Sequence, residues 1–261
     1  MTNVLAGAFG FLGAIIAHDL AAQALLDLPL RPFAGTCPRC GNGRGWSRFA
    51  CPRCGRRPGR ELVVVAVSVV FAIGFAVALG PVWALLAYLG FLTLTLALGI
   101  TDVDALRIVD RLNLRGSVAV IGALGVAALA DGGESAFLRA MLGGAAYFAG
   151  TNLLFFAVGG KGFGYGDVKL SVSLGVFTAY LSWGTLGWAV FLTALIGGLL
   201  SLMVVVAGAV RGRGSGEDPE SGRRDTIREA MRVELPYGPS MILGSWTAIV
   251  LAGLGAFPVP T

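Results

Sequence analysis

Apolar residues along this chain come in long blocks that are separated by shorter polar segments. The blocks cover residues 4–17, 62–79, 82–100, 116–130, 136–158, 168–181, 186–210 and 241–257. A helix that crosses a bilayer needs about 20 predominantly apolar residues, and several of these blocks reach that length. Within a block the apolar residues do not alternate with polar ones, as they would in a half-buried strand. We therefore predict an all-α, polytopic membrane protein with about eight transmembrane helices.

Composition agrees with a membrane protein and argues against a nucleic-acid partner. Of the 261 residues, 56% are hydrophobic and 13% are charged, whereas soluble domains average about 25% charged residues. The net charge is +5, but the basic residues lie in the segments between the apolar blocks. Membrane topology explains such a distribution better than a polyanion does. One His and four Cys also leave little material for histidine-based metal or triad chemistry.

Lysine and arginine are distributed unevenly between alternate loops. Of the 20 basic residues, eight lie within 31–60, three within 107–115 and six within 211–232, and Lys161 and Lys169 flank a glycine-rich run. Arg139 alone lies in the other set of loops. Because cytoplasmic loops carry the excess of Lys and Arg, we expect these basic segments to face the cytoplasm. Both termini then lie on the opposite side.

Two Cys-x-x-Cys pairs lie in the first basic segment and predict a metal site. Cys37, Cys40, Cys51 and Cys54 supply four thiolates at a spacing that suits tetrahedral zinc in a small ribbon. Two disulfides are the alternative, which a cytoplasmic location disfavours. Protein ligands would fill all four positions, so the site would be structural.

The chain accordingly divides into three parts. Residues 1–30 are a first transmembrane segment with its interfacial end, and residues 31–60 are a cytoplasmic, zinc-ribbon-like insertion. Residues 61–261 form a seven-helix membrane core, in which residues 211–240 are a flexible cytoplasmic loop.

Two acids at the ends of apolar blocks are the candidate catalytic residues. Asp102 and Asp167 both lie on the cytoplasmic side by the charge distribution, and a carboxylate within hydrocarbon costs roughly 2.5–3.5 kcal/mol on insertion scales. Two adjacent carboxyl groups share one proton. The ionised group can then take a proton from water while the protonated group polarises a carbonyl, which hydrolyses an amide. Gly164 and Gly166 would shape the backbone beside Asp167 and leave room for substrate.

The motifs around these acids resemble those of the prepilin peptidases, or type IV leader peptidases, which are Gly-x-Gly-Asp intramembrane aspartic proteases. Residues 162–170, Gly-Phe-Gly-Tyr-Gly-Asp-Val-Lys-Leu, resemble the second catalytic motif of that family, and residues 100–104, Ile-Thr-Asp-Val-Asp, resemble the first. The Cys-x-x-Cys pairs, Glu61 and the run Pro236-Tyr237-Gly238-Pro239 occur in the family's order. The resemblance covers most of the chain and assigns catalysis to Asp102 and Asp167. One departure is Val109, where the family usually has Pro.

The resemblance implies an endopeptidase that cleaves the leader peptide of type IV prepilins or pseudopilins at the cytoplasmic face of a bacterial inner membrane. Its substrates would carry a short basic leader and a hydrophobic helix that stays in the bilayer. Large members of the family also methylate the new amino terminus with S-adenosylmethionine. The insertion is shorter here, so we assign no site for S-adenosylmethionine and expect it as a cofactor only if that activity is retained.

Other interpretations of the same residues stay open. A transporter or assembly scaffold could use the buried acids for ion coupling, and an intramembrane aspartic protease for other substrates could use the same pair. Asp104 and Asp110 fit a solvated loop of mixed charge. Lys169 could reach toward the interface or act on Asp167. His18 and Asp19 fit a polar pair at the cytoplasmic end of the first span.

Overall fold

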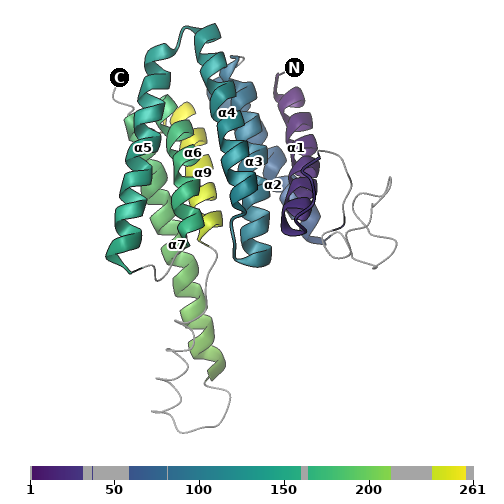
Figure 1. The fold of residues 1–261 in the computed structure, drawn as a ribbon, viewed down its shortest axis with the longest axis vertical. Coiled ribbons are helices and arrows are strands. Elements are labelled where there is room, and N and C mark those ends of the chain that lie inside the picture. Colours follow the sequence, from purple (N-terminus) through teal and green to yellow (C-terminus); the bar gives the residue numbers. More distant parts are fainter. Residues whose placement is uncertain are drawn as a thin grey trace.

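The part of the chain that the structure describes is entirely helical where it has regular secondary structure. A computed structural model describes residues 2–31, 37, 59–80, 82–159, 164–212 and 237–256. The elements there are α1 (Thr2–Leu25), α2 (Gly59–Leu79), α3 (Ala84–Ala105), α4 (Asp110–Asp131), α5 (Glu134–Ala157), α6 (Tyr165–Leu181), α7 (Trp183–Gly212) and α9 (Gly238–Gly253). Figure 1 shows them as one bundle of roughly aligned helices. The predicted all-α class is confirmed for these residues.

Six of these helices are long and apolar enough to cross a membrane. They are α1, α2 from Glu61, α3, α4, α5, and α7 as far as Val204. Their exposed side chains include many large apolar groups, which is the surface that lipid covers in a membrane bundle. The chain is therefore a multi-pass membrane protein. Helices α6 and α9, with 17 and 16 residues, are shorter, so the count of eight spans stays a prediction.

Helices α1 and α4 extend furthest beyond the apolar blocks that predicted them. Helix α1 continues through the alanine-rich residues after position 17, and Asp19 is buried in this extension. Near the end of α1, the side-chain amide of Gln23 donates to the carbonyl oxygen of Arg31 and accepts from its backbone amide. Helix α4 begins at Asp110, so the solvated loop expected before residue 116 is helical over much of its length. An acid in the first turn favours such an early start.

Glycines let neighbouring helices approach closely in both halves of the bundle. A Cβ on Gly10 of α1 would lie 2.9 Å from the carbonyl oxygen of Ser68 in α2. A Cβ on Gly175 of α6 would lie 2.8 Å from the carbonyl oxygen of Gly143 in α5. Small residues serve this purpose in membranes, because lipid supplies no hydrophobic drive for helices to associate.

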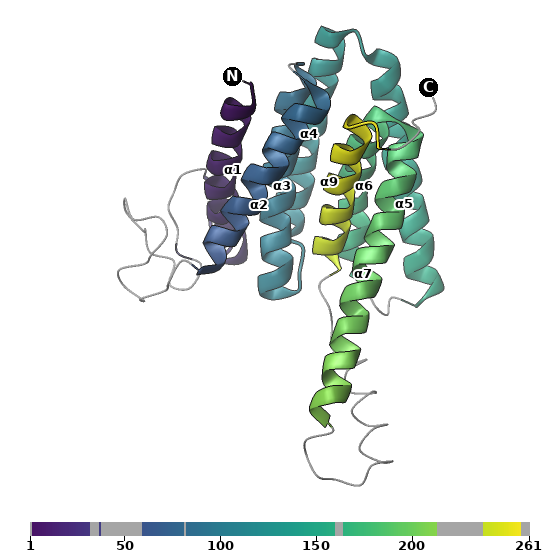
Figure 2. The same ribbon diagram turned by 180° about the vertical axis from the view of Figure 1, so that it is seen from behind.

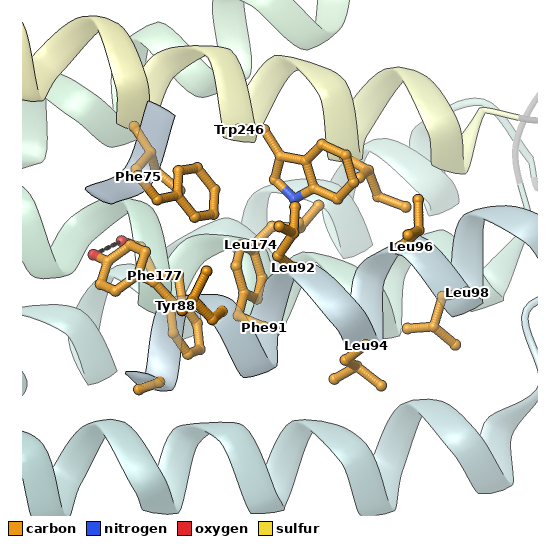
Figure 3. Close-up of a cluster of buried hydrophobic side chains, with 14 of the residues drawn as sticks. Phe75, Tyr88, Phe91, Leu92, Leu94, Leu96, Leu98, Leu174, Phe177 and Trp246 are labelled. Carbon is orange, nitrogen blue, oxygen red and sulfur yellow. Dashed lines mark hydrogen bonds between the residues drawn. The ribbon is translucent and has the colours of Figure 1, made fainter. Parts of the chain in front are cut away.

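An aromatic core joins the helices that carry the candidate site. Figure 3 shows Phe75 of α2, Tyr88 and Phe91 of α3, Phe177 of α6 and Trp246 of α9 within this core. Phe91 and Phe177 stack with their ring centroids 4.2 Å apart, and the Tyr88 hydroxyl donates to the Phe177 carbonyl oxygen at 2.6 Å. Helix α9 contacts α2, α3, α6 and α7 and lies among them (Figure 2). Helices α3, α6 and α9 are thus held together by a packed interior.

The end of the bundle opposite the aspartates is closed by charged caps. Arg139 of α5 donates to the carbonyl oxygens of Ala179, Tyr180 and Leu181, in the last turn of α6, at 2.9, 2.6 and 2.9 Å. Asp131 accepts from the amides of Trp83 and Ala84, where α3 begins, at 3.3 and 3.0 Å. Each charge complements the dipole of the helix end that it caps. The one basic residue outside the predicted cytoplasmic segments therefore has a structural role.

Candidate active site

Asp102 lies in the last turn of α3 and points into the bundle. Its side chain is buried, with 6% of the residue exposed. Its Oδ2 accepts a hydrogen bond from the backbone amide of Gly238, the first residue of α9, at 3.1 Å. Asp104, two residues later, is exposed. The alternation of burial along this turn thus places Asp102, and not Asp104, in the protein interior.

Asp167 lies in the first turn of α6 and is also buried, with 5% exposed. Its Oδ2 accepts from the Gly164 amide at 3.1 Å, and its own amide donates to the Gly164 carbonyl oxygen at 3.0 Å. These bonds satisfy groups that the start of a helix leaves unpaired. Its Oδ1 is buried and has no hydrogen-bond partner among the described residues. One carboxylate oxygen of Asp167 is therefore bonded at the start of α6, and the other accepts no hydrogen bond from the described residues.

The two carboxyl groups meet at Gly238. A Cβ built on Gly238 would lie 2.7 Å from Oδ2 of Asp102 and 3.3 Å from Oδ1 of Asp167. The two carboxyl groups thus lie on the same side of Gly238 and close to each other. Two such groups in a buried setting hold one proton between them, because both cannot ionise without mutual repulsion. The fold thus brings together the two acids that were predicted from the sequence to be catalytic.

The two glycines before Asp167 act differently from each other. Gly164 precedes α6 with an extended backbone, at φ −81° and ψ 155°. Gly166 is already helical, and its missing side chain lets Ile108 approach, because a Cβ there would lie 2.9 Å from the Ile108 Cβ. Gly164 thus supplies the extended residue at which α6 begins, and Gly166 gives close contact with the turn between α3 and α4. Residues 160–163 lie outside the described part of the chain.

An ion pair links α4 to α6 beside the site. Lys169 Nζ lies 2.7 Å from Oδ2 of Asp110, and the two side chains are 40% and 65% exposed. The Lys169 ammonium also lies 5.4 Å from the centre of the Tyr165 ring. The sequence left Lys169 between two roles, and its partner turns out to be Asp110. Asp110 is correspondingly an ion-paired residue of a helix and not part of a loop.

Three residues at the site were not predicted individually from the sequence. Gly238 donates to Asp102 and lies beside Asp167, and Tyr237 precedes it as the N-cap of α9. Tyr237 and Tyr147 of α5 lie near enough to Asp167 to interact with its charge. The run Pro236-Tyr237-Gly238-Pro239 was visible only as part of the family resemblance. It contains no charge or metal ligand that would have marked it as part of a reactive centre.

The predicted zinc ligands lie almost entirely outside the described residues. Cys37 is described and is buried, whereas Cys40, Cys51 and Cys54 fall in the parts of the chain that are not described. A buried thiol suits a structural metal ligand, and the four-cysteine site stays a prediction.

Part of the chain matches a known protein family. Residues 89–202 match the model of the type IV leader peptidase family. The match includes Asp102 and Asp167 together with helices α4, α5 and α6, and it stops before α9. Comparisons with curated proteins and with solved structures gave no match.

Proposed function

We propose that this chain, which belongs to the type IV leader peptidase family, is a membrane-embedded aspartic endopeptidase. Its proposed substrates are type IV prepilins or pseudopilins, whose leader peptides it removes at the cytoplasmic face of a bacterial inner membrane. The observation that carries the proposal is the position of Asp102 and Asp167. They come from different helices, are both buried, and approach the same point beside Gly238.

The reaction needs one water molecule and the single proton that the pair shares. The ionised carboxylate takes a proton from water as the water oxygen attacks the carbon of the scissile carbonyl. The protonated carboxyl group gives its proton to the carbonyl oxygen, which forms a tetrahedral diol. The carbon–nitrogen bond then breaks, the leaving amine takes a proton from one carboxyl group, and the diol hydroxyl returns one to the other. The pair ends with one proton, as it began.

The charged rim around the pair supports a reaction near the membrane surface. The exposed charged residues described at this end of the bundle include Asp104, Arg107, Asp110, Arg111 and Arg115. Basic residues dominate the loops of this side, which favours a cytoplasmic location. A leader peptide could then be received from the cytoplasm while the hydrophobic helix of the substrate stays in the bilayer.

The cysteine-rich insertion is proposed to be a zinc-bound structural unit that helps to receive the leader. Cys37, Cys40, Cys51 and Cys54 would hold the metal, and the burial of Cys37 fits that role. Zinc bound by four thiolates would order the insertion and take no part in hydrolysis. Methylation of the cleaved product with S-adenosylmethionine remains an optional second activity, to which no described residue is assigned.

Substitution of either aspartate tests the proposed function. Asp102→Asn and Asp167→Asn should each abolish cleavage of a co-expressed prepilin, because an amide cannot exchange the shared proton. Both variants should still be found in the membrane fraction. Asp104→Asn is the matched control, and it should cleave as the unaltered protein does. Cleavage at the unaltered rate by either of the first two variants would contradict the proposal.

A parallel reaction tests the second activity. Purified protein is incubated with a prepilin and labelled S-adenosylmethionine, and the processed pilin is analysed for label at its new amino terminus. Transfer of label would assign methylation to this chain, whereas cleavage without label would restrict it to hydrolysis.

A further inference from the structure

The first turn of α9 reaches the space between the two aspartates. We propose that Gly238 is a positioning residue of the catalytic pair, whose amide holds Asp102 and whose missing side chain keeps the space between Asp102 and Asp167 open for water and the scissile peptide. This inference rests on the proposed function. Gly238 lies outside residues 89–202, which carry the family match.

Among the described residues, the amide of Gly238 is the backbone donor of the first turn of α9 that reaches another helix. Tyr237 is the N-cap of α9, and its carbonyl oxygen already accepts from the amides of Ser240 and Met241, at 3.0 and 3.3 Å. Pro239 has no amide hydrogen. Gly238 alone therefore has an amide left over, and it donates to Oδ2 of Asp102 at 3.1 Å.

This contact places the Asp102 carboxylate at the positive end of a helix. The N-terminus of an α-helix carries partial positive charge and favours a carboxylate there. Asp167 has the same arrangement with its own helix, through the amide of Gly164. Each carboxylate thus has one oxygen held by a helix start. For Asp102 that helix, α9, comes from a distant part of the chain, so its orientation depends on how α9 packs.

Space, and not backbone conformation, requires glycine at position 238. Its backbone does not lie in the left-handed region that favours glycine. A Cβ there would instead lie 2.7 Å from Oδ2 of Asp102, 3.3 Å from its Cγ, and 3.3 Å from Oδ1 of Asp167. The first distance is shorter than real Cβ contacts. A methyl group would therefore push the carboxyl groups apart and occupy the place that the reactants need.

The packing of α9 fixes where the Gly238 amide points. The Tyr237 ring rests on Gly197 of α7, where a Cβ would lie 2.7 Å from Tyr237 Cε2. Trp246, further along α9, donates through Nε1 to the Thr95 hydroxyl of α3 at 3.1 Å and belongs to the aromatic core in Figure 3. Helix α9 is thereby held against α3, the helix that carries Asp102.

Replacement of Gly238 by alanine tests the role directly. Gly238→Ala should lower kcat for prepilin cleavage by at least about 100-fold, because a displacement of about 1 Å in a catalytic group has that effect. KM should change less than kcat, and the melting temperature should fall little, because the helix preference of alanine over glycine offsets part of the cost of displacing the carboxyl groups. Gly198→Ala is the matched control, since a Cβ there meets nothing within 4 Å. It should cleave as the unaltered protein does.

The outcomes of this experiment separate the two proposals. Cleavage by the unaltered protein with loss in Gly238→Ala supports the positioning role, whereas an unchanged kcat in Gly238→Ala overturns it and leaves the proposed function standing. A parallel fall in melting temperature, kcat and substrate affinity would assign Gly238 a merely structural role, and would also overturn the inference.

Hydrogen exchange tests the amide contact without altering Gly238, and it decides the matter if Gly238→Ala does not fold. The Gly238 amide should exchange at least about tenfold faster in Asp102→Ala than in the unaltered protein, because its acceptor is gone. In Asp102→Asn, whose amide oxygen still accepts, exchange should stay close to that of the unaltered protein. Equal exchange in Asp102→Ala and the unaltered protein would overturn the inference. The measurement needs no substrate, so it does not depend on prepilin cleavage.

Discussion

At the scale of single residues, the site depends on which acids the fold buries. Asp102 and Asp167 are buried beside Gly238, whereas Asp110 pairs with Lys169 at the exposed rim. The same residue type thus occupies two environments within a short distance of chain. A buried carboxyl pair can move protons between water and substrate. An exposed ion pair is surrounded by solvent and contributes little to stability.

Removing the rim ion pair should therefore have a small effect. Lys169→Ala should lower the free energy of unfolding by less than about 1 kcal/mol, which is the usual range for exposed pairs. Prepilin cleavage should remain readily measurable. Unfolding of the purified protein in detergent and a cleavage assay check the two expectations.

Asp110→Asn serves as the reciprocal control, because it removes the other charge of the same pair. Loss of cleavage in both variants, with folding intact, would show that the pair acts in catalysis and would contradict this expectation.

At the scale of helices, the ends are what position the acids. Asp167 is held by the start of α6, and the opposite end of α6 is capped by the Arg139 guanidinium, which bonds three carbonyl oxygens. Asp102 lies at the end of α3, whose start is capped by Asp131. Charged caps at one end of the bundle therefore fix the helices that carry the acids at the other end.

Loss of the Arg139 cap should destabilise α6. Arg139→Ala should lower the free energy of unfolding by about 2–4 kcal/mol, because it removes charge-assisted hydrogen bonds and leaves carbonyl groups unpaired. Arg139→Lys keeps the charge without the planar donors and should give an intermediate loss. Equilibrium unfolding in mixed micelles measures both variants, and identical stability of Arg139→Ala and the unaltered protein would count against the cap.

At the scale of the whole molecule, the aromatic core makes one unit of helices that are distant in sequence. Phe177 of α6 stacks on Phe91 and also meets Tyr88 edge-on, with ring centroids 4.2 and 5.0 Å apart. Trp246 of α9 donates a hydrogen bond to the Thr95 hydroxyl of α3. Since α3, α6 and α9 each supply a part of the candidate site, the geometry of the pair depends on this core.

Truncation of the core should therefore affect both stability and cleavage. Phe177→Ala should cost about 3–5 kcal/mol of stability, as large-to-small changes in a core do, and cleavage should fall because α3 and α6 lose part of the packing between them. Phe156→Ala is the matched control, since Phe156 is 69% exposed on α5. Unfolding and cleavage assays on the two variants, side by side, would contradict the prediction if they gave the same values.

Much of the fold could be predicted from the sequence, because its strongest signal is local. Apolar blocks long enough to cross a bilayer predicted the helices, and the charge distribution singled out Arg139 as an exception. Helix ends were less predictable, because apolarity marks the membrane-facing stretch and not where a helix stops. Helix α1 runs on through alanines, and α4 starts at Asp110, within a polar segment.

The candidate acids were also within reach of sequence patterns, because a carboxylate beside hydrocarbon is costly and two family-like motifs surround Asp102 and Asp167. Gly238 was not, although it lies beside both. Its amide bonds a carboxylate 136 residues away, and nothing local in a Tyr-Gly-Pro run announces such a contact. Sequence thus predicted the helices and the reactive groups, whereas packing between distant helices decided how those groups meet, because that geometry exists only once α3, α6 and α9 are assembled.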